Sequence, residues 1–315
     1  MRARSLTLEF APLLLLLSPV AVTLPTANLL GSDCNGDATI TAVSKLPMIP
    51  SPPETNHSVP MIPRYTFKVP STGAGKRGIA YEDPAQARAF DSPAIGWSYN
   101  WNARPPPSIS VQGVGISLTS LGSFVPMCWG ERSFATWHQD AEWAIRNGAT
   151  SFLGFNEPDH AEQAHLSPAK AAEYWMKYLQ PYAGRVRLGS PATTNSNQPG
   201  QGIVWMKEFL SICAKLGCTM DFLAVHWYNT DPVGSAERFK EYVAEISHLA
   251  GGKSVWITEF GVWGASDAVQ AEWLEEVMPW LDSNPTVERY AYFAAINNHL
   301  VNNGQLTLTG LVYNS

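Results

Sequence analysis

From Lys76 to the C-terminus, short apolar runs alternate with longer amphipathic segments. The apolar runs predict eight strands: Arg77–Ala80, Ile95–Asn100, Ser123–Pro126, Ser151–Asn156, Arg187–Ser190, Phe222–Trp227, Ser254–Glu259 and Arg289–Ala294. Repeated β-α units of this number are typical of one large parallel fold. The sequence therefore predicts an α/β protein, a (β/α)8 TIM barrel that forms a single domain over residues 76–315.

The segments between these strands carry helical signals. Five of them have helical spacing of apolar residues or recognisable ends: Phe134–Arg146, Pro168–Leu179, Val204–Leu216, Ala236–Leu249 and Ala268–Leu281. Ser167 and Pro168 suit the N-cap and first helical position, and Gly217 suits a C-cap. The earliest crossovers are weaker, because Pro84–Phe90 is short and the segment after the prolines at 105–107 has little helical character.

The pattern of residues 1–27 predicts a secretory signal peptide. Arg2 and Arg4 supply positive charge, an apolar stretch runs from Ala11 to Ala21, and small residues follow. An uncleaved membrane anchor is the alternative, but the apolar run is short for a span of about 20 residues. We therefore expect a secreted protein of the extracellular space or cell wall.

Residues 28–75 contain seven prolines and little periodicity, which indicates a linker or propeptide without a core of its own. The sequon Asn56-His57-Ser58 lies in this stretch. The chain has four cysteines, which fit an oxidising compartment but allow three pairings. Cys213 and Cys218 are close enough in sequence to form one bridge.

Charge excludes some partners. The formal net charge is −6 and only 15% of the residues are charged, so the surface offers nothing to a phosphate backbone or to anionic lipid. Nucleic acid and membrane partners are disfavoured, and we expect a monomer that acts on a neutral polymer. The aromatic share of 11% is compatible with sugar stacking, although aromatic rings also fill cores.

Two glutamates stand at the ends of predicted strands. Glu157 follows an apolar run in the sequence Asn156-Glu157-Pro158-Asp159, and Glu259 follows another before Phe260-Gly261. In a (β/α)8 barrel the active site forms at the carboxyl ends of the strands. Cleavage of a glycosidic bond needs an acid for the leaving oxygen and a second carboxylate at the oxocarbenium-like centre. The pair therefore predicts a glycoside hydrolase.

Neighbouring polar residues suit the same chemistry. Asn156 is placed to donate a hydrogen bond to a sugar 2-hydroxyl. His226 and Tyr228 are two positions apart, so they share one face of a strand, from which they can contact the second carboxylate or the sugar.

Three segments carry a specific resemblance: Gly154-Phe155-Asn156-Glu157-Pro158-Asp159, Val225-His226-Trp227-Tyr228 and Trp256-Ile257-Thr258-Glu259-Phe260-Gly261. They resemble the glycosyl hydrolase catalytic core of glycoside hydrolase family 128, whose fungal members are often called alkali-sensitive-linkage-type proteins. The resemblance runs from about Lys76 to the C-terminus and includes Gly96–Trp101. It implies a retaining β-1,3-glucanase with residues 76–315 as catalytic domain, Glu157 as general acid/base and Glu259 as nucleophile. Retention requires the two carboxyl groups to lie about 5–5.5 Å apart.

Further side chains are candidate sugar contacts. They are aromatic or amide residues near predicted strand ends, each of which is also a plausible core residue: Trp97, Tyr99, Asn100, Trp101, Trp129, Trp263 and Tyr292. Tyr292 is included because retaining barrels of this kind usually carry a Trp platform at the end of strand eight. Here that stretch reads Arg289-Tyr290-Ala291-Tyr292-Phe293.

Neither a metal nor a cofactor is expected. The pair Asp159-His160 has no third ligand at suitable spacing, and no Cys-x-x-Cys accompanies the cysteines. Two other functions stay open: a non-catalytic cell-wall protein that binds glucan, and a hydrolase of another polysaccharide such as mannan or galactan. The presence of both carboxylates favours an enzyme.

Overall fold

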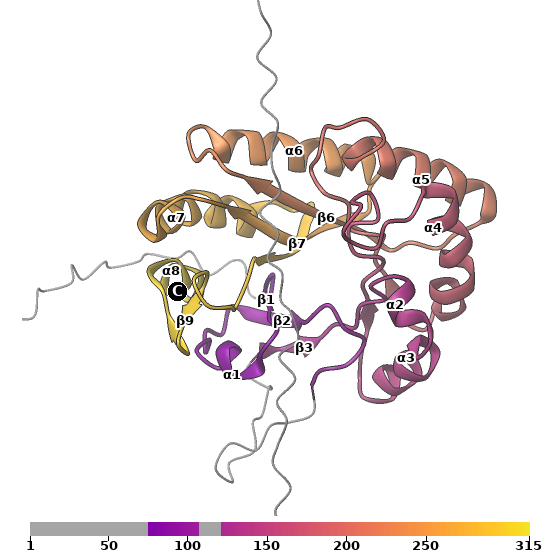
Figure 1. The fold of residues 1–315 in the computed structure, drawn as a ribbon, viewed down its shortest axis with the longest axis horizontal. Helices are drawn as coiled ribbons and strands as arrows, with labels where there is room; N and C mark the ends of the chain where they lie inside the picture. Colours follow the sequence, from indigo (N-terminus) through magenta and orange to yellow (C-terminus); the bar gives the residue numbers. More distant parts are fainter. Residues whose placement is uncertain (1–74, 107–120) are drawn as a thin grey trace, which may run out of the picture. The chain divides into compact units, whose positions relative to one another are not determined.

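The computed structural model of the chain describes residues 75–106 and 121–315, all within one compact unit, Arg64–Ser315 (Figure 1). The predicted signal peptide, the Asn56 sequon and Cys34 lie outside the described residues. So does the linker or propeptide except for its last residue, and so does most of the segment after the prolines at 105–107.

Eight strands follow one another in the predicted order: β1 (Arg77–Ala80), β2 (Ile95–Tyr99), β3 (Ser123–Phe124), β4 (Ser151–Phe152), β5 (Arg187–Leu188), β6 (Phe222–Asn229), β7 (Ser254–Val262) and β8 (Val287–Tyr292). Every pairing among them is parallel. A small antiparallel pair, β9 (Val301–Asn302) and β10 (Gln305–Leu306), follows β8. The predicted α/β class with parallel strands is confirmed.

The strands pair as one sheet of six, in the order β3-β2-β1-β8-β7-β6, and a separate pair, β4-β5. Isolated parallel bridges connect the two groups, from Met127 to Leu153 on one side and from Gly189 to Phe222 on the other. The pairings thus follow the cyclic order of the predicted barrel, with the ladder reduced to single bridges at these two places. Figure 1 shows the strands in the centre of the unit and helices around them.

The helices are α1 (Pro84–Ala87), α2 (Glu131–Phe134), α3 (Trp137–Arg146), α4 (Pro168–Tyr174), α5 (Gly202–Leu216), α6 (Ser235–Leu249), α7 (Asp267–Ser283) and α8 (Leu308–Asn314). A π-helical turn, Trp175–Leu179, and a 3-10 turn, Gln180–Tyr182, continue α4. The single helix predicted over Phe134–Arg146 is wrong at its start, because α2 ends at Phe134 and α3 begins at Trp137.

The helix ends follow the local sequence. The Ser167 hydroxyl accepts a hydrogen bond from the Lys170 N–H, and Pro168 occupies the first turn of α4, as predicted. Gly217 ends α5 in the left-handed conformation at φ 76°, which glycine adopts without a Cβ clash. These residues fix where the chain enters α4 and where it leaves α5.

Two kinds of core hold the elements together. Two clusters lie between strands and helices, where Phe260 stacks on Phe239 of α6. A third cluster joins side chains of different strands, with the Phe222 and Trp256 rings stacked 4.0 Å apart and Trp97 beside them. The third cluster fills the space that the strands enclose and forms a floor beneath their carboxyl ends.

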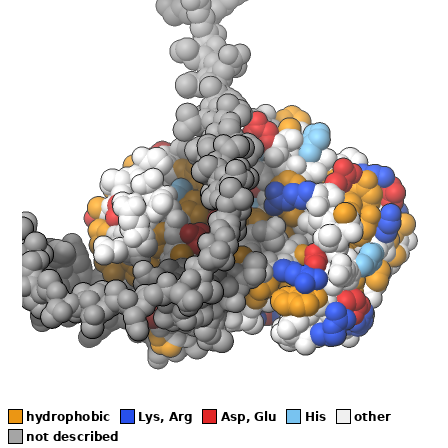
Figure 2. Space-filling view, turned by 60° about the horizontal axis from the view of Figure 1, so that its bottom comes forward, with side chains coloured by type: hydrophobic (Ala, Val, Ile, Leu, Met, Phe, Trp, Pro, Cys, Tyr) orange, Lys and Arg blue, Asp and Glu red, His pale blue; other side chains and the backbone are white. Residues whose placement is uncertain are grey.

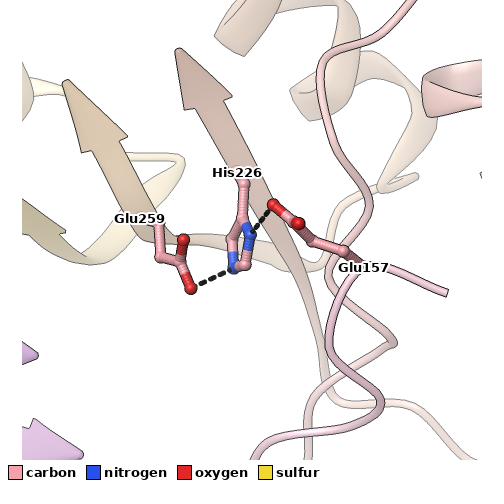
Figure 3. A group of neighbouring side chains, drawn as sticks. All are labelled: Glu157, His226 and Glu259. Atoms are coloured by element: carbon pink, nitrogen blue, oxygen red, sulfur yellow. Dashed lines mark hydrogen bonds and ion pairs between the residues drawn. The ribbon is translucent and has the colours of Figure 1, made fainter. Parts of the chain in front are cut away.

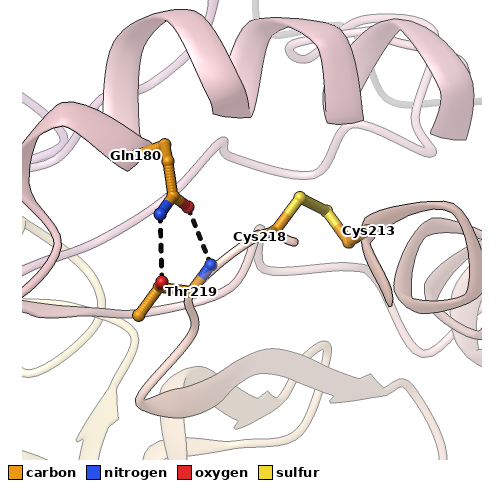
Figure 4. Close-up of a disulfide and its surroundings, with 4 residues drawn as sticks. All are labelled: Gln180, Cys213, Cys218 and Thr219. Atoms are coloured by element: carbon orange, nitrogen blue, oxygen red, sulfur yellow. Dashed lines mark hydrogen bonds between the residues drawn. A yellow bond between two sulfur atoms is a disulfide. The ribbon is translucent and has the colours of Figure 1, made fainter. Parts of the chain in front are cut away.

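A disulfide joins Cys213 and Cys218 at the end of α5, as the sequence allows (Figure 4). Next to it, the Gln180 side chain accepts from the Thr219 N–H at 2.7 Å and donates to its hydroxyl at 3.0 Å. The disulfide and the hydrogen bonds to Gln180 together hold the turn that leads into β6. Cys128 is buried and has no disulfide partner among the described residues.

The described surface is of mixed character. Figure 2 shows acidic and basic side chains interspersed among hydrophobic ones on the face in view. Among the helices that the structure describes, none has the length and apolar character needed to cross a bilayer.

Candidate active site

A pocket of about 570 Å³ opens at the carboxyl ends of the strands. The described residues that line it are Glu82, Asn100, Trp101, Asn102, Trp129, Arg132, Asn156, Glu157, Gln163, Glu259 and Phe293. All stand at a strand end or in the segment after it, at the edge where parallel α/β folds build their active sites. The two glutamates singled out by the sequence therefore share one cavity.

Glu157 lies in the loop after β4 in an unusual backbone conformation. Its φ is 41°, in the left-handed region that costs a non-glycine residue about 1–3 kcal/mol. The Glu157 N–H donates to the Ala192 carbonyl at 2.8 Å, so the strained residue is held by the neighbouring loop. Such strain is often found at functional positions, because surrounding contacts maintain a geometry that the chain would not choose alone.

Glu259 stands near the end of β7, where the pairing with β6 is irregular. Val225 pairs with Ile257, but the next residue of β6, His226, pairs with Glu259, so Thr258 is the extra residue. A β-bulge of this kind re-aims side chains and is common beside active sites. Here it places the buried His226 imidazole beside the Glu259 carboxylate, which lines the pocket.

Glu259 is 5% exposed, and its carboxylate is surrounded by hydrogen-bond donors. Trp101 donates its indole N–H to Oε1 at 2.6 Å, and Tyr228 donates its hydroxyl to Oε2 at 2.5 Å. The Tyr99 hydroxyl lies 3.4 Å from Oε1. This donor set fixes the orientation of the carboxylate and favours its ionised form.

His226 lies between the two glutamates (Figure 3). Its Nδ1 is 2.8 Å from Oε1 of Glu157, and its Nε2 is 3.4 Å from Oε1 of Glu259. The second contact is within ion-pair distance but lacks the alignment of a hydrogen bond. One carboxylate oxygen of Glu157 and one of Glu259 lie within 4.8 Å of each other.

Burial and charge act in opposite directions on this group. Burial works to lower the pKa of His226, but the charge of Glu259 and the hydrogen bond and charge of Glu157 outweigh it, so the pKa is raised. Burial raises the pKa of Glu259, and the charge of Glu157 adds to this. The charge of His226 and the hydrogen bonds from Tyr228 and Trp101 oppose that rise.

The two tyrosines beside Glu259 remain proton donors. Burial, followed by the nearby charge of Glu259, raises the pKa of Tyr99 and of Tyr228 well above the ordinary value. Both phenols therefore stay neutral through the physiological range and keep their protons for hydrogen bonds, Tyr228 to the Glu259 carboxylate and Tyr99 to the Thr258 carbonyl.

Glu157, His226 and Glu259 are also the group of described residues that could gather around a metal ion. Their contacts suit hydrogen bonding better. The two ring nitrogens face different carboxylates, whereas one ion takes only one nitrogen of an imidazole, and 2.8 Å between Nδ1 and the Glu157 Oε1 is an ordinary hydrogen-bond length. The donor geometry thus describes a proton-sharing group.

Four of the predicted sugar contacts line the pocket: Asn100, Trp101, Trp129 and Asn156. Trp129 carries the Arg132 guanidinium 3.7 Å above its ring, so one of its faces is already covered. Asn156 donates its amide to Gln163 Oε1 at 3.1 Å, and its side-chain oxygen Oδ1 is buried without a hydrogen-bond partner among the described residues. One of the two N–H groups of the amide that was expected to meet a sugar hydroxyl is therefore engaged within the protein.

Trp263 is 45% exposed and stands beside the pocket, with its ring against Tyr228 and Phe293. Tyr99 lies below the pocket, where its hydroxyl donates to the Thr258 carbonyl at 2.8 Å. Both positions remain compatible with a role at the site, Trp263 as a rim and Tyr99 as a support for Glu259.

Trp97, a candidate sugar contact, does not line the pocket. Its side chain is fully buried in the cluster enclosed by the strands, and its indole N–H donates to the Lys76 carbonyl at 3.0 Å. Lys76 directly precedes β1, so Trp97 fills the opposite end of the strands from the pocket.

Tyr292 is also misplaced. It is 1% exposed, packs against Phe260 in the layer between strands and helices, and donates its hydroxyl to Gln270 of α7 at 2.8 Å. The next residue, Phe293, lines the pocket instead. Adjacent strand residues face opposite sides, so an error of one position exchanges a core ring for a pocket ring.

Five lining residues were not predicted from the sequence, namely Glu82, Asn102, Arg132, Gln163 and Phe293. Glu82 could have been found as a carboxylate two residues beyond a predicted strand, and Phe293 as the neighbour of Tyr292. Gln163 and Arg132 belong to segments whose path over the pocket is not encoded in any local pattern.

Comparison with known proteins gives a consistent result. The family model described as "Glycosyl hydrolase catalytic core" matches residues 78–313. Alkali-sensitive linkage protein 1 of Schizosaccharomyces pombe is 30% identical over 266 residues, which are 77% of this chain and 45% of that protein. The chain thus spans less than half the length of this curated relative.

Solved structures of glycoside hydrolase family 128 share the fold. A curdlan-specific exo-β-1,3-glucanase of subgroup III from Blastomyces gilchristii, in complex with glucose, is 45% identical at a TM-score of 0.68, covering 78% of this chain and 99% of that one. A subgroup II endo-β-1,3-glucanase from Sorangium cellulosum is 30% identical at a TM-score of 0.64, covering 76% and 98%. A subgroup I endo-β-1,3-glucanase from Amycolatopsis mediterranei with laminaritriose is 26% identical at a TM-score of 0.62, with the same coverage.

Proposed function

Because the chain belongs to the glycosyl hydrolase catalytic core family, with solved relatives in glycoside hydrolase family 128, we propose that it hydrolyses β-1,3-glucan with retention of configuration. The catalytic domain in this proposal is residues 76–315. Glu157 is the general acid/base and Glu259 the nucleophile.

One observation carries the mechanism. Carboxylate oxygens of Glu157 and Glu259 lie within 4.8 Å of each other in one pocket. Retaining glycosidases hold their carboxyl groups about 5–5.5 Å apart, whereas inverting enzymes need about 6.5–9.5 Å to admit a water between them. The separation supports direct attack by one carboxylate on the anomeric carbon.

In the first step, Glu259 forms a bond to the anomeric carbon as the bond to the glycosidic oxygen breaks. Glu157 gives its proton to that oxygen, so the leaving sugar departs neutral. The donors around Glu259 suit this role, because the hydrogen bonds from Trp101 and Tyr228 orient the carboxylate and oppose the rise in its pKa that burial causes.

In the second step, water attacks the anomeric carbon and the bond to Glu259 breaks. Glu157, now ionised, takes the proton from the water, and both glutamates return to their starting states. His226 contacts both carboxylates, so its imidazole can interact with whichever of them carries the negative charge at each step.

Aromatic side chains give the pocket its sugar-binding walls in this proposal. Trp101 and Phe293 line the cavity with ring centroids 5.7 Å apart, and Trp263 extends this aromatic wall to the surface. Apolar faces of a glucose ring pack on such rings, while Asn100, Asn102 and Arg132 are the polar part of the same lining.

Secretion belongs to the same proposal. It is supported by the basic and apolar N-terminus, by the disulfide between Cys213 and Cys218, and by the likeness to a fungal alkali-sensitive linkage protein. The expected destination is the extracellular space or cell wall, and the expected state is a monomer. Fractionation of cells that express the full chain tests the destination.

The test of the function is a product profile. Wild type and Glu259→Gln are incubated with laminarin, mannan and galactan, and the released oligosaccharides are separated by chromatography. We expect products from laminarin with wild type only. Binding of laminarin without any product from wild type would support a glucan-binding protein, and products from another polymer alone would assign a different substrate.

A further inference from the structure

Asp159 is a buried carboxylate two residues after Glu157, and nothing in the mechanism uses it. It is 8% exposed. Its Oδ2 accepts from the Thr194 hydroxyl at 2.5 Å and from the Gly202 N–H at 2.8 Å, and its Oδ1 accepts from the Thr194 N–H at 3.1 Å. Gly202 is the first residue of α5, so the carboxylate also lies at the positive end of a helix of fifteen residues.

These bonds join two loops. Asp159 belongs to the loop after β4, and Thr194 belongs to the segment between β5 and α5. The same two segments meet again where the Glu157 N–H donates to the Ala192 carbonyl at 2.8 Å. The left-handed Glu157 is thus held on both sides, by its own N–H and by the side chain of Asp159 two positions later.

The segment after β5 also positions the partner of Glu157. The His226 N–H donates to the Thr193 carbonyl at 3.0 Å. Residues 192–194 therefore support both ends of the 2.8 Å contact between Glu157 and His226 Nδ1. A change in this segment moves the two groups relative to each other.

From this arrangement we propose that Asp159 is a positioning residue for the acid/base glutamate. Its carboxylate clamps residues 192–194 to the loop after β4 and so keeps Glu157 in the conformation from which its proton reaches the leaving oxygen. The proposal rests on the proposed function, and it concerns the acid step only, because Glu259 on β7 receives no contact from Asp159.

The dependence on the leaving group separates positioning from general damage. Laminarin has a sugar hydroxyl as leaving group and needs the acid, whereas a 2,4-dinitrophenyl β-glucoside has a leaving group that departs without protonation. kcat/KM reports the first step for both substrates. A misplaced Glu157 lowers the value on laminarin and spares the value on the dinitrophenyl glucoside, whereas general damage to the site lowers both.

The variant is Asp159→Asn, which keeps the shape but replaces one accepting oxygen by a donor. We expect kcat/KM on laminarin to fall by roughly 10- to 100-fold, the cost of a displacement near 1 Å, with kcat/KM on the dinitrophenyl glucoside close to wild type. Equal losses on the two substrates, or no loss on laminarin, would overturn the proposal.

The matched control is Asp267→Asn. Asp267 is a carboxylate of the same kind, which accepts from the Leu308 and Thr309 N–H groups and the Thr309 hydroxyl at the start of α8, and it does not line the pocket. This variant should leave the ratio of the two kcat/KM values unchanged. A shift of that ratio in the control as large as in Asp159→Asn would contradict a specific role of Asp159.

A second variant covers the case in which Asp159→Asn does not fold, and it leaves charge unaltered. Thr194→Val removes the hydroxyl donor and keeps the N–H donor. Its readout needs no turnover: the ¹⁵N signal of His226 Nδ1 reports the contact with Glu157. We expect that signal to move toward the value of an unbonded imidazole, whereas an unchanged signal would refute the clamp even if the chain proved inactive on every glucan.

Discussion

At the scale of single residues, the site depends on how Glu259 is kept ionised in a buried position. Desolvation alone favours the neutral carboxyl group, and the pKa is indeed raised. Hydrogen bonds from Tyr228 and Trp101 act the other way by stabilising the anion. The balance between these influences sets the lowest pH at which a nucleophile is available.

Removal of one donor should therefore shift the pH profile. In Tyr228→Phe the carboxylate loses the 2.5 Å hydrogen bond to Oε2, so the pKa of Glu259 rises further. Because attack requires the ionised form, activity disappears as pH falls through this pKa, and the acidic limb of kcat/KM moves to higher pH. A profile of kcat/KM against pH on laminarin checks this, and an acidic limb that stays in place or moves to lower pH would contradict the role of Tyr228.

The pocket ring at the end of β8 gives a second residue-level prediction. Phe293→Ala removes an apolar wall and should weaken substrate binding by about 1 kcal/mol, which is roughly a fivefold rise in KM. Tyr292→Phe is the control, since the hydroxyl it loses bonds Gln270 away from the pocket. If KM rises in Tyr292→Phe and stays constant in Phe293→Ala, the assignment of the two rings is reversed.

At the scale of elements, the position of Glu157 depends on the close approach of β4 and β5. A Cβ on Gly154 would meet the Ser190 and Gly189 carbonyl oxygens at 2.7 and 2.8 Å, which are backbone atoms that cannot rotate away. Gly154→Ala should thus separate these strands and lower both Tm and activity. Gly261→Ala is the control for stability, because its added methyl would meet its nearest neighbours at 3.5 Å. Equal Tm values for the two variants would show that the close approach is not required.

The strands and their order were predictable because each has an apolar run bounded by polar residues. The extent of pairing was not predictable. The sequence predicts β4 over Ser151–Asn156 and β5 over Arg187–Ser190, but each strand pairs over only two residues. Their carboxyl ends bend into the pocket loops and make single bridges there. Apolar residues indicate that a segment is buried, but they do not show how many ladder hydrogen bonds it makes. A regularly paired strand and a strand with single bridges therefore look alike in sequence.

The two glutamates were predictable because each follows a strand in a distinctive motif. The side of the strand to which a residue points was not predictable. Tyr292 was expected to face the pocket, but it is buried between strands and helices, and Phe293 lines the pocket instead. The register between β7 and β8 shifts between Ile257 and Phe260, and no single sequence reveals where such an irregularity falls. Arg132 and Gln163 were missed for a different reason, because they reach the pocket from helix α2 and from the loop after β4 rather than from strand ends.

At the scale of the whole described domain, one buried charge pair joins its first strand to its last helices. Arg77 of β1 contacts Asp282 of α7 at 3.3 Å, and it donates to Tyr290 of β8 and to the Ser315 carbonyl at the C-terminus. The cluster lies at the amino ends of the strands, opposite the pocket. Its effect should be on stability and not on catalysis.

Asp282→Ala tests this separation. It leaves the buried Arg77 guanidinium without its carboxylate, and breaking a buried pair in this way costs about 3–5 kcal/mol of the free energy of unfolding. Urea denaturation measures the loss, and kcat on laminarin at low temperature should stay near the wild-type value. A loss of kcat with an unchanged unfolding midpoint would show that the cluster communicates with the pocket.

The central claim is that Glu259 bonds covalently to the sugar while Glu157 manages the proton. Incubation with a 2-deoxy-2-fluoro glucoside that carries a good leaving group slows the second step and accumulates the intermediate. Mass spectrometry of the protein and its peptides should then find one fluoroglucosyl group, on the peptide that contains Glu259. Full turnover of laminarin by a protein that never acquires this label, or a label on Glu157, would contradict the account.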